Sequence, residues 1–234
     1  MNFEELKANL QNNAVELVAV SKTKPVDQIR GVYEKGQRIF GENRVQELVK
    51  KQPALPRDIE WHMIGHLQRN KVKQIAPFIS MIHSVDNFRL LAEINKQALK
   101  NDRTINCLLQ FHIAREESKS GMSMEEATEG LSSEEFGEME NVSICGVMGM
   151  ATFTSDEKQV RQEFRILKEI FTDLKSRFFN AKDSFQHISM GMSGDFEIAV
   201  EEGSTMVRIG SLIFGSRGWW NTDDADDYDF LWCK

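Results

Sequence analysis

The chain has 234 residues, of which 41% are hydrophobic and 28% are charged, and its net charge is −7. This balance is typical of a soluble globular protein, and the length suffices for one α/β barrel with a full core. Because acidic residues outnumber basic ones, the chain lacks the excess of positive charge that binding to a phosphate backbone requires. Nucleic acid is therefore not an expected partner.

Cysteine usage and the N-terminus indicate a cytoplasmic protein. Cys107, Cys145 and Cys233 are odd in number and widely spaced, with neither zinc-ligand spacing nor a disulfide framework. The N-terminus is acidic and amphipathic and lacks the apolar core of a signal peptide. Because no apolar run reaches the length of a bilayer, we expect no membrane partner.

Short apolar, β-prone segments alternate with helical ones along the chain. A leading helix is predicted near residues 3–12, and amphipathic spacing predicts helices over 26–35, 87–100 and 156–179. The predicted strands are residues 16–21, 38–41, 59–65, 80–85, 105–113, 143–150, 185–190 and 206–211. Eight strands that alternate with helices predict an α/β fold, a single (β/α)₈ TIM barrel. This single domain covers residues 1–234 and ends in an acidic tail over residues 222–234. A doubly wound open sheet is the alternative.

Lys22 follows the first predicted strand directly. Residues 14–20 are nearly all apolar, and a run this short is typical of a parallel strand buried on both faces. Pro25 then sets the first turn of a helix. Lys22 therefore lies at the carboxyl end of a parallel strand, where α/β folds place their chemistry. It is either a solvated strand-end charge or an amine that forms a Schiff base.

Two further motifs follow the seventh and eighth predicted strands. Residues 189–195 combine small residues with hydroxyl groups, which form either an anion cradle of backbone N–H groups or a plain turn with Ser193 as a helix cap. Gly210, two residues after Arg208, lets the backbone approach a ligand closely. Barrels commonly bind phosphate at these two loops. A reactive amine opposite a phosphate cradle predicts pyridoxal 5′-phosphate (PLP) as the cofactor.

Polar residues near the ends of the second and third predicted strands could have either a structural role or a role in binding. Asn43 either caps the helix that follows it or contacts a ligand above the barrel. His62 lies within the third strand and His66 just beyond it, so the two do not share a helix face. We predict packing and loop roles for these histidines and no metal site.

Five motifs, taken in order, resemble the pyridoxal phosphate homeostasis protein family. They are residues 19–25 (AVSKTKP), 40–43 (FGEN), 61–68 (WHMIGHLQ), 187–193 (HISMGMS) and 207–210 (VRIG), and the likeness runs from about residue 18 to residue 215. The resemblance implies the barrel of the alanine racemase N-terminal domain, fold type III among PLP proteins. It also implies that Lys22 holds PLP as an internal aldimine.

The same resemblance implies the remaining binding residues. Ser193, Gly210 and Ser211 fall where the family binds the phosphate, Arg208 where an arginine faces the pyridine nitrogen, and Asn43 where a residue lines the ring. Arg69 departs from the smaller residue expected there, which leaves the loop after the third strand in question.

The arginine and the tyrosines argue against an enzyme. A guanidinium stays charged and disfavours a protonated pyridine nitrogen beside it, which weakens the electron sink. Family resemblance implies that racemases of this fold take a catalytic tyrosine from a partner's C-terminal domain. The sequence ends at Lys234 without such a domain, and its tyrosines are Tyr33, on a predicted outer helix, and Tyr228, in the acidic tail.

We therefore expect a non-enzymatic protein that stores, protects or delivers PLP, with PLP-dependent apo-enzymes as recipients. The alternatives are an amino-acid racemase of narrow substrate range and a cofactor-free Schiff-base aldolase. We expect a monomer with a partly exposed cofactor, because no long apolar helix face requires a partner and the net charge of −7 favours solubility.

Overall fold

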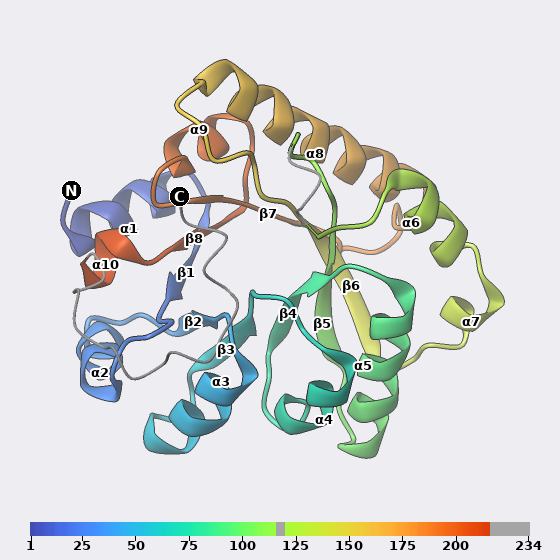
Figure 1. Cartoon of the computed structure of the whole chain (residues 1–234), viewed down its shortest axis with the longest axis horizontal. Coiled ribbons are helices and arrows are strands. Elements are labelled where there is room, and N and C mark those ends of the chain that lie inside the picture. The colour runs from blue at the N-terminus through green and yellow to red at the C-terminus, as the bar shows by residue number, and fades with distance from the viewer. Residues whose placement is uncertain (116–119, 216–234) are drawn as a thin grey trace.

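A closed barrel of eight parallel strands forms the centre of the computed structural model, which describes residues 1–115 and 120–215 (Figure 1). The strands pair in chain order, and the last closes the ring on the first, with Val18 opposite Arg208. The strands are β1 (Glu16–Val20), β2 (Ile39–Glu42), β3 (Glu60–Met63), β4 (Met81–Val85), β5 (Ile105–Gln110), β6 (Val142–Met148), β7 (His187–Met192) and β8 (Met206–Ile209). The predicted barrel is confirmed, and the alternative of an open doubly wound sheet is wrong.

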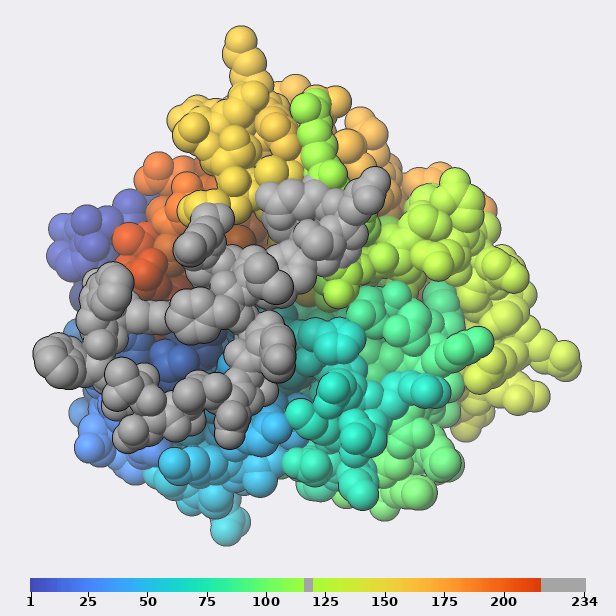
Figure 2. Space-filling view, in the orientation of Figure 1, coloured from blue at the N-terminus to red at the C-terminus, as the bar shows by residue number. Residues whose placement is uncertain are grey.

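Helices surround the barrel in chain order (Figure 1), and the colours of the space-filling view pass round the molecule in the same order (Figure 2). The α-helices are α1 (Phe3–Asn12), α2 (Val26–Glu34), α3 (Val45–Lys51), α4 (Val72–Ile75), α5 (Phe88–Lys100), α6 (Met124–Leu131), α7 (Glu134–Gly137), α8 (Glu157–Phe178), α9 (Phe196–Glu201) and α10 (Ser211–Phe214). Two 3₁₀ turns, η1 (Gln52–Ala54) and η2 (Arg69–Lys71), complete the described elements. The four predicted helix ranges are confirmed, and the helices expected after Asn43 and Ser193 are α3 and α9. Helices α4, α6, α7 and α10 were not predicted, because most of them are too short to show a clear period.

Local sequence explains where the long helices begin. Asn2 and Glu5 form a capping box before α1, since each side chain accepts a hydrogen bond from the other's backbone N–H. Asn87 caps α5 and Asp156 caps α8 through side-chain oxygens in the same way. Pro25 is the N-cap of α2, one residue before the helical position predicted for it.

The apolar residues form two cores. The larger one lies between the strands and the helices, and the smaller fills the barrel interior, where it includes Val18, Met81, Leu108, Cys145, Met148 and Met206. Side chains alternate between these cores along each strand. On β8, Met206 belongs to the interior core and Val207 to the outer one, so Arg208 points back into the barrel, one level nearer its carboxyl end.

Two further sequence predictions concern membrane-spanning segments and the acidic tail. None of the helices described in residues 1–115 and 120–215 has the length and apolar character to span a membrane. The acidic tail over residues 222–234, with Tyr228 and Cys233, lies outside the described residues.

Candidate functional site

The predicted site residues gather at one end of the barrel. Lys22 and Asn43 follow the carboxyl ends of β1 and β2, while Ser193 follows β7. Gly210 and Ser211 follow β8 directly. In a parallel barrel all carboxyl ends lie on the same face, which is the face that carries active sites in this architecture.

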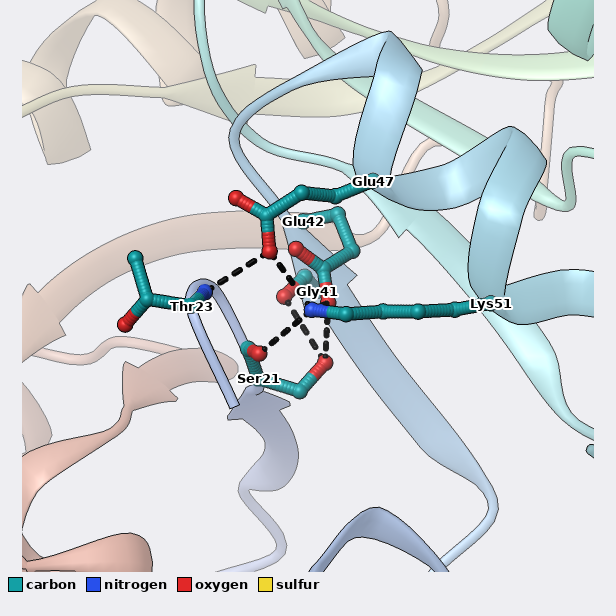
Figure 3. Close-up of polar contacts among 6 residues, drawn as sticks. All are labelled: Ser21, Thr23, Gly41, Glu42, Glu47 and Lys51. Carbon is teal, nitrogen blue, oxygen red and sulfur yellow. Dashed lines mark hydrogen bonds and ion pairs between the residues drawn. The ribbon is translucent and has the colours of Figure 1, made fainter. Parts of the chain in front are cut away.

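The turn that carries Lys22 is held on both sides by polar contacts (Figure 3). Before it, the Ser21 carbonyl oxygen accepts a hydrogen bond from Lys51 Nζ at 2.9 Å. After it, the Thr23 N–H donates to Glu47 Oε2 at 2.7 Å. Thr23 has a φ of 63°, a left-handed conformation that is costly for a β-branched residue. Side chains of α3 therefore stabilise the backbone on both sides of Lys22.

Lys51, Glu42 and Glu47 form a largely buried charged group, which we name the Lys51 cluster (Figure 3). An ammonium has three N–H donors, and Lys51 uses all of them: on Glu42 Oε1 at 2.7 Å, on Glu47 Oε2 at 2.6 Å and on the Ser21 carbonyl. Glu42 Oε1 also accepts from the Ser21 hydroxyl at 2.6 Å. Two carboxylates and one ammonium thus meet directly behind the Lys22 turn.

One atom of the Lys51 cluster is left without a partner. Glu42 is fully buried, and its Oε2 makes no hydrogen bond. Burial raises the pKa of Glu42 to about 7, although Lys51 and the Ser21 hydroxyl favour the charged form. The Glu42 carboxyl group can therefore gain or lose its proton near physiological pH.

Lys24 connects the Lys22 turn to the carboxyl end of helix α10. Its Nζ donates to the carbonyl oxygens of Phe214 at 3.1 Å and Gly215 at 3.3 Å, at the carboxyl end of α10. Because α10 begins at Ser211, the lysine-bearing turn and the predicted phosphate-binding segment are joined through one short helix.

The loops after β7 and β8 meet as predicted. Ser193 Oγ accepts a hydrogen bond from the Gly210 N–H at 3.3 Å. The backbone N–H groups of Ser193 and Gly194 donate no hydrogen bond to any described residue. The N–H of Ser211 has no partner inside α10, because it lies in the first turn. The prediction of Ser193 as a helix cap is wrong, since α9 begins later and its N-cap is Asp195.

Asn43 is not a helix cap either. Helix α3 begins at Val45, its N-cap is Arg44, and no side chain caps it. The Asn43 side chain is half-buried and makes no hydrogen bond with other described residues. Its backbone packs on Gly65 so tightly that a Cβ at Gly65 would overlap the Asn43 carbonyl oxygen. The capping role is thus wrong for Asn43, and its contact with a ligand stays a prediction.

Arg208 lies inside the barrel and is only 4% exposed. Its Nη1 donates to the Ser189 carbonyl at 2.7 Å and to Ser189 Oγ at 2.6 Å, and its Nη2 donates to the Gly149 carbonyl at 3.1 Å. Burial lowers the pKa of Arg208 to about 10, while Asp195 favours the charged form. The guanidinium therefore remains charged at neutral pH, and no described hydrogen bond uses its Nε.

His62, His66 and Tyr33 lie where the sequence predicted them, and His62 makes one hydrogen bond that was not predicted. His66 is exposed in the loop after β3, with Nδ1 3.4 Å from Asp86, and Tyr33 on α2 donates to Asp58 outside the barrel. His62 is buried, but it also takes part in a hydrogen-bonded chain inside the barrel. Among the residues described, no group of three or more metal-ligating side chains is arranged to hold an ion.

Sequence reasoning missed the residues that support the site. Glu42 lies in the FGEN motif, but no role was predicted for it. Glu47 and Lys51 have no distinguishing local pattern, because they are spaced as an ordinary surface ion pair on a helix. Ser189 was predicted as the first residue of the cradle and not as a partner of Arg208, and His83 lies in β4, which carried no motif. Only the closed barrel brings these residues behind Lys22 and Arg208.

Comparison with known proteins decides the family. The sequence profile of the family described as "Alanine racemase, N-terminal domain" matches residues 1–218. The pyridoxal phosphate homeostasis protein of Aquifex aeolicus is 42% identical over 212 residues, which cover 90% of this chain and 91% of the relative. This chain belongs to the pyridoxal phosphate homeostasis protein family. The resemblance drawn from the five motifs is thus confirmed.

Solved structures of this family have the same fold. PipY of Synechococcus elongatus without PLP superposes with a TM-score of 0.82 at 33% identity, covering 90% of this chain and 99% of that one. The same protein with PLP bound gives a TM-score of 0.79 at 32% identity with the same coverage. The family fold therefore extends over nearly the whole of the described chain.

Proposed function

We propose that this protein binds PLP and acts in its intracellular homeostasis, by storing, protecting or delivering the cofactor. The observation that carries the proposal is that Lys22, Arg208 and the hydrogen-bonded pair of Ser193 and Gly210 all lie at the carboxyl end of the barrel. The relatives named above support it, since one is called a pyridoxal phosphate homeostasis protein and another was solved with PLP bound.

The residues present fit this cofactor. Its phosphate needs several N–H donors, and the backbone N–H groups of Ser193, Gly194 and Ser211 are unpaired within the described chain or their helix. Gly210 has no side chain to obstruct the approach, and a Cβ there would come within 3.1 Å of the Val20 carbonyl oxygen. The pyridine nitrogen accepts hydrogen bonds, which suits the unused Nε–H of Arg208.

Lys22 is the proposed covalent attachment residue. When bound, the cofactor supplies an aldehyde that condenses with a primary amine, releases one water, and reverses by hydrolysis or exchange with another amine. The Lys51 cluster fixes the backbone on both sides of Lys22, so the chain's part is to present the amine at a set position. Ser193, Gly210 and Ser211 would hold the phosphate, and Asn43 would line the ring.

Carrier function, rather than catalysis, follows from Arg208. Its positive charge disfavours protonation of the pyridine nitrogen, and an unprotonated ring is a weak electron sink. A racemase also needs a second base opposite the lysine, and Tyr33 is not in that position because it donates to Asp58 at 2.7 Å on the outside of the barrel. We propose that turnover of amino acids by this protein is slow and incidental.

A spectrum of the purified protein tests this function. We expect a visible absorption band that borohydride abolishes, after which peptide mapping finds the reduced cofactor on Lys22. Lys22→Ala removes the band, and Lys50→Ala, an exposed lysine on α3, leaves it unchanged. Attachment to Lys24, or to another lysine, would refute the assignment. Rapid racemisation of D- and L-amino acids would refute the carrier role in favour of the racemase alternative.

We further propose a single-domain cytoplasmic monomer that transfers PLP to apo-enzymes. The support is the absence of a zinc-like or disulfide cysteine pattern and the net charge of −7. Light scattering at low micromolar concentration tests the oligomeric state, and a stable dimer that buries the Lys22 turn would contradict it.

A further inference from the structure

Four side chains form one hydrogen-bonded chain across the barrel interior. Arg208 Nη1 lies 2.6 Å from Ser189 Oγ, Ser189 Oγ lies 3.0 Å from His83 Nδ1, and His83 Nε2 lies 3.0 Å from His62 Nδ1. They come from β8, β7, β4 and β3, and none is more than 4% exposed. The chain therefore joins two opposite parts of the barrel wall through its buried centre.

The arginine gives this chain a single direction. A guanidinium donates hydrogen bonds and accepts none, so Ser189 Oγ must be the acceptor from Arg208. Among the described contacts, His83 Nδ1 is the acceptor available to the one hydroxyl hydrogen of Ser189, and satisfying that hydrogen leaves Nδ1 unprotonated. A neutral His83 carries its proton on Nε2 and donates it to His62 Nδ1. His62 is left with its proton on Nε2 as well.

Burial keeps both rings neutral, which this direction requires. Desolvation lowers the pKa of His62 to about 3 and that of His83 well below its usual range. The Arg208 guanidinium and the neighbouring rings of His62 and His187 add to the effect on His83. A protonated His83 would point a second donor at Ser189 Oγ and leave the hydroxyl hydrogen without an acceptor.

The chain also decides which N–H groups of Arg208 remain for a ligand. Both hydrogens of Nη1 are used on Ser189, and one hydrogen of Nη2 is used on the Gly149 carbonyl. Within the described residues, the Nε–H and the second Nη2–H are unused. Loss of the hydroxyl, or of the ring that orders it, would remove one of these three hydrogen bonds and leave the guanidinium oriented by the two backbone carbonyls alone.

We propose that Ser189, His83 and His62 are positioning residues for Arg208. This inference rests on the proposed function. Ser189 accepts from the guanidinium, His83 accepts from Ser189, and His62 accepts from His83. This chain holds the free N–H groups of Arg208 in one orientation toward the pyridine nitrogen. They do not themselves contact the cofactor, and each acts through the next.

The hydrogen-bond direction is tested first without the cofactor. Long-range ¹H–¹⁵N spectra of the PLP-free protein report which ring nitrogen of each histidine carries the proton. We expect the Nε2–H tautomer for both His62 and His83, unchanged from about pH 8 to about pH 5, because burial disfavours the imidazolium. An Nδ1–H tautomer or an imidazolium at His83 would overturn the proposal.

Effects on the bound cofactor are tested with paired variants. His83→Phe removes the acceptor, whereas His83→Asn keeps an acceptor oxygen near the position of Nδ1; Ser189→Ala and Ser189→Thr form the same kind of pair. We expect the two disruptive variants to weaken PLP binding roughly tenfold and to shift the absorption band, and the two conservative ones to restore both. His66→Phe, at an exposed ring outside the chain, changes neither.

Failure of this inference and failure of the proposed function give different results. If the wild-type protein binds no PLP, the proposed function is refuted. If PLP binds but the disruptive variants, still folded by circular dichroism, show wild-type affinity and spectrum, the positioning role is refuted. If a disruptive variant does not fold, the tautomers in the wild-type protein and the conservative variants still decide the question.

Discussion

Replacing Lys51 with methionine tests the charged group behind the Lys22 turn. The substitution keeps the apolar stem but removes the ammonium, so three hydrogen bonds are lost and Glu42 remains buried without a counterion. Breaking a buried ion pair by removing one partner costs about 3–5 kcal/mol, since the other charge is left uncompensated. We expect a loss of stability in this range for Lys51→Met at about pH 8.

The loss of stability caused by Lys51→Met should grow as the pH rises. Burial raises the pKa of Glu42 to about 7, and Lys51 opposes the rise, so in Lys51→Met the folded-state pKa is higher still. A carboxyl group with a raised folded-state pKa stabilises the fold below its unfolded pKa of about 4.3, and this stability is lost as pH rises toward the folded-state value. In the wild type the free energy of unfolding stops falling near pH 7 for this reason. In Lys51→Met the free energy of unfolding continues to fall above about pH 7, at up to about 1.4 kcal/mol per pH unit.

Urea unfolding followed by far-UV circular dichroism measures the free energy of unfolding at each pH. Combining Lys51→Met with Glu42→Gln removes the uncompensated charge, so we expect the double variant to regain at least about 2 kcal/mol and to lose the additional pH slope. Lys50→Met, at an exposed neighbour on α3, is the matched control and should change stability by less than about 0.5 kcal/mol. A cost below about 1 kcal/mol for Lys51→Met, or a wild-type pH slope, would refute the reasoning.

Three further predictions concern the site and the barrel wall. Ser193→Ala should weaken PLP binding by about 1–3 kcal/mol in equilibrium dialysis and should affect pyridoxal, which lacks the phosphate, much less; equal losses would contradict a phosphate role. Gly210→Val should weaken PLP binding more than Ser193→Ala, because its Cβ comes within 3.1 Å of the Val20 carbonyl oxygen; wild-type affinity would contradict this. Gly146→Ala should destabilise the barrel by about 2 kcal/mol or more in urea unfolding, since φ is 151° and a Cβ would overlap the His187 carbonyl oxygen. Gly137→Ala, which meets no atom within 4 Å, is its control, and equal effects would refute the steric explanation.

The alternation of strands and helices, and with it the face of the barrel that holds the site, could be predicted from local sequence. Burial on both sides of β1 and the amphipathic spacing of α2, α5 and α8 are local properties that a few neighbouring residues specify. Lys22, Ser193 and Gly210 could be predicted together because the ends of parallel strands share one face in any barrel of this kind.

The side chains that support those residues could be identified only in the folded barrel. Asn43 and Ser193 were equally suited to capping from their local sequence, and the observed helix starts exclude that role for both. Lys51 has the pattern of a surface lysine, but closure of β1 on β2 places it against the Ser21 carbonyl and Glu42. His83 and Ser189 are 106 residues apart, and their contact exists because the ring of strands closes. Such contacts depend on barrel register and burial, which no short stretch of sequence specifies.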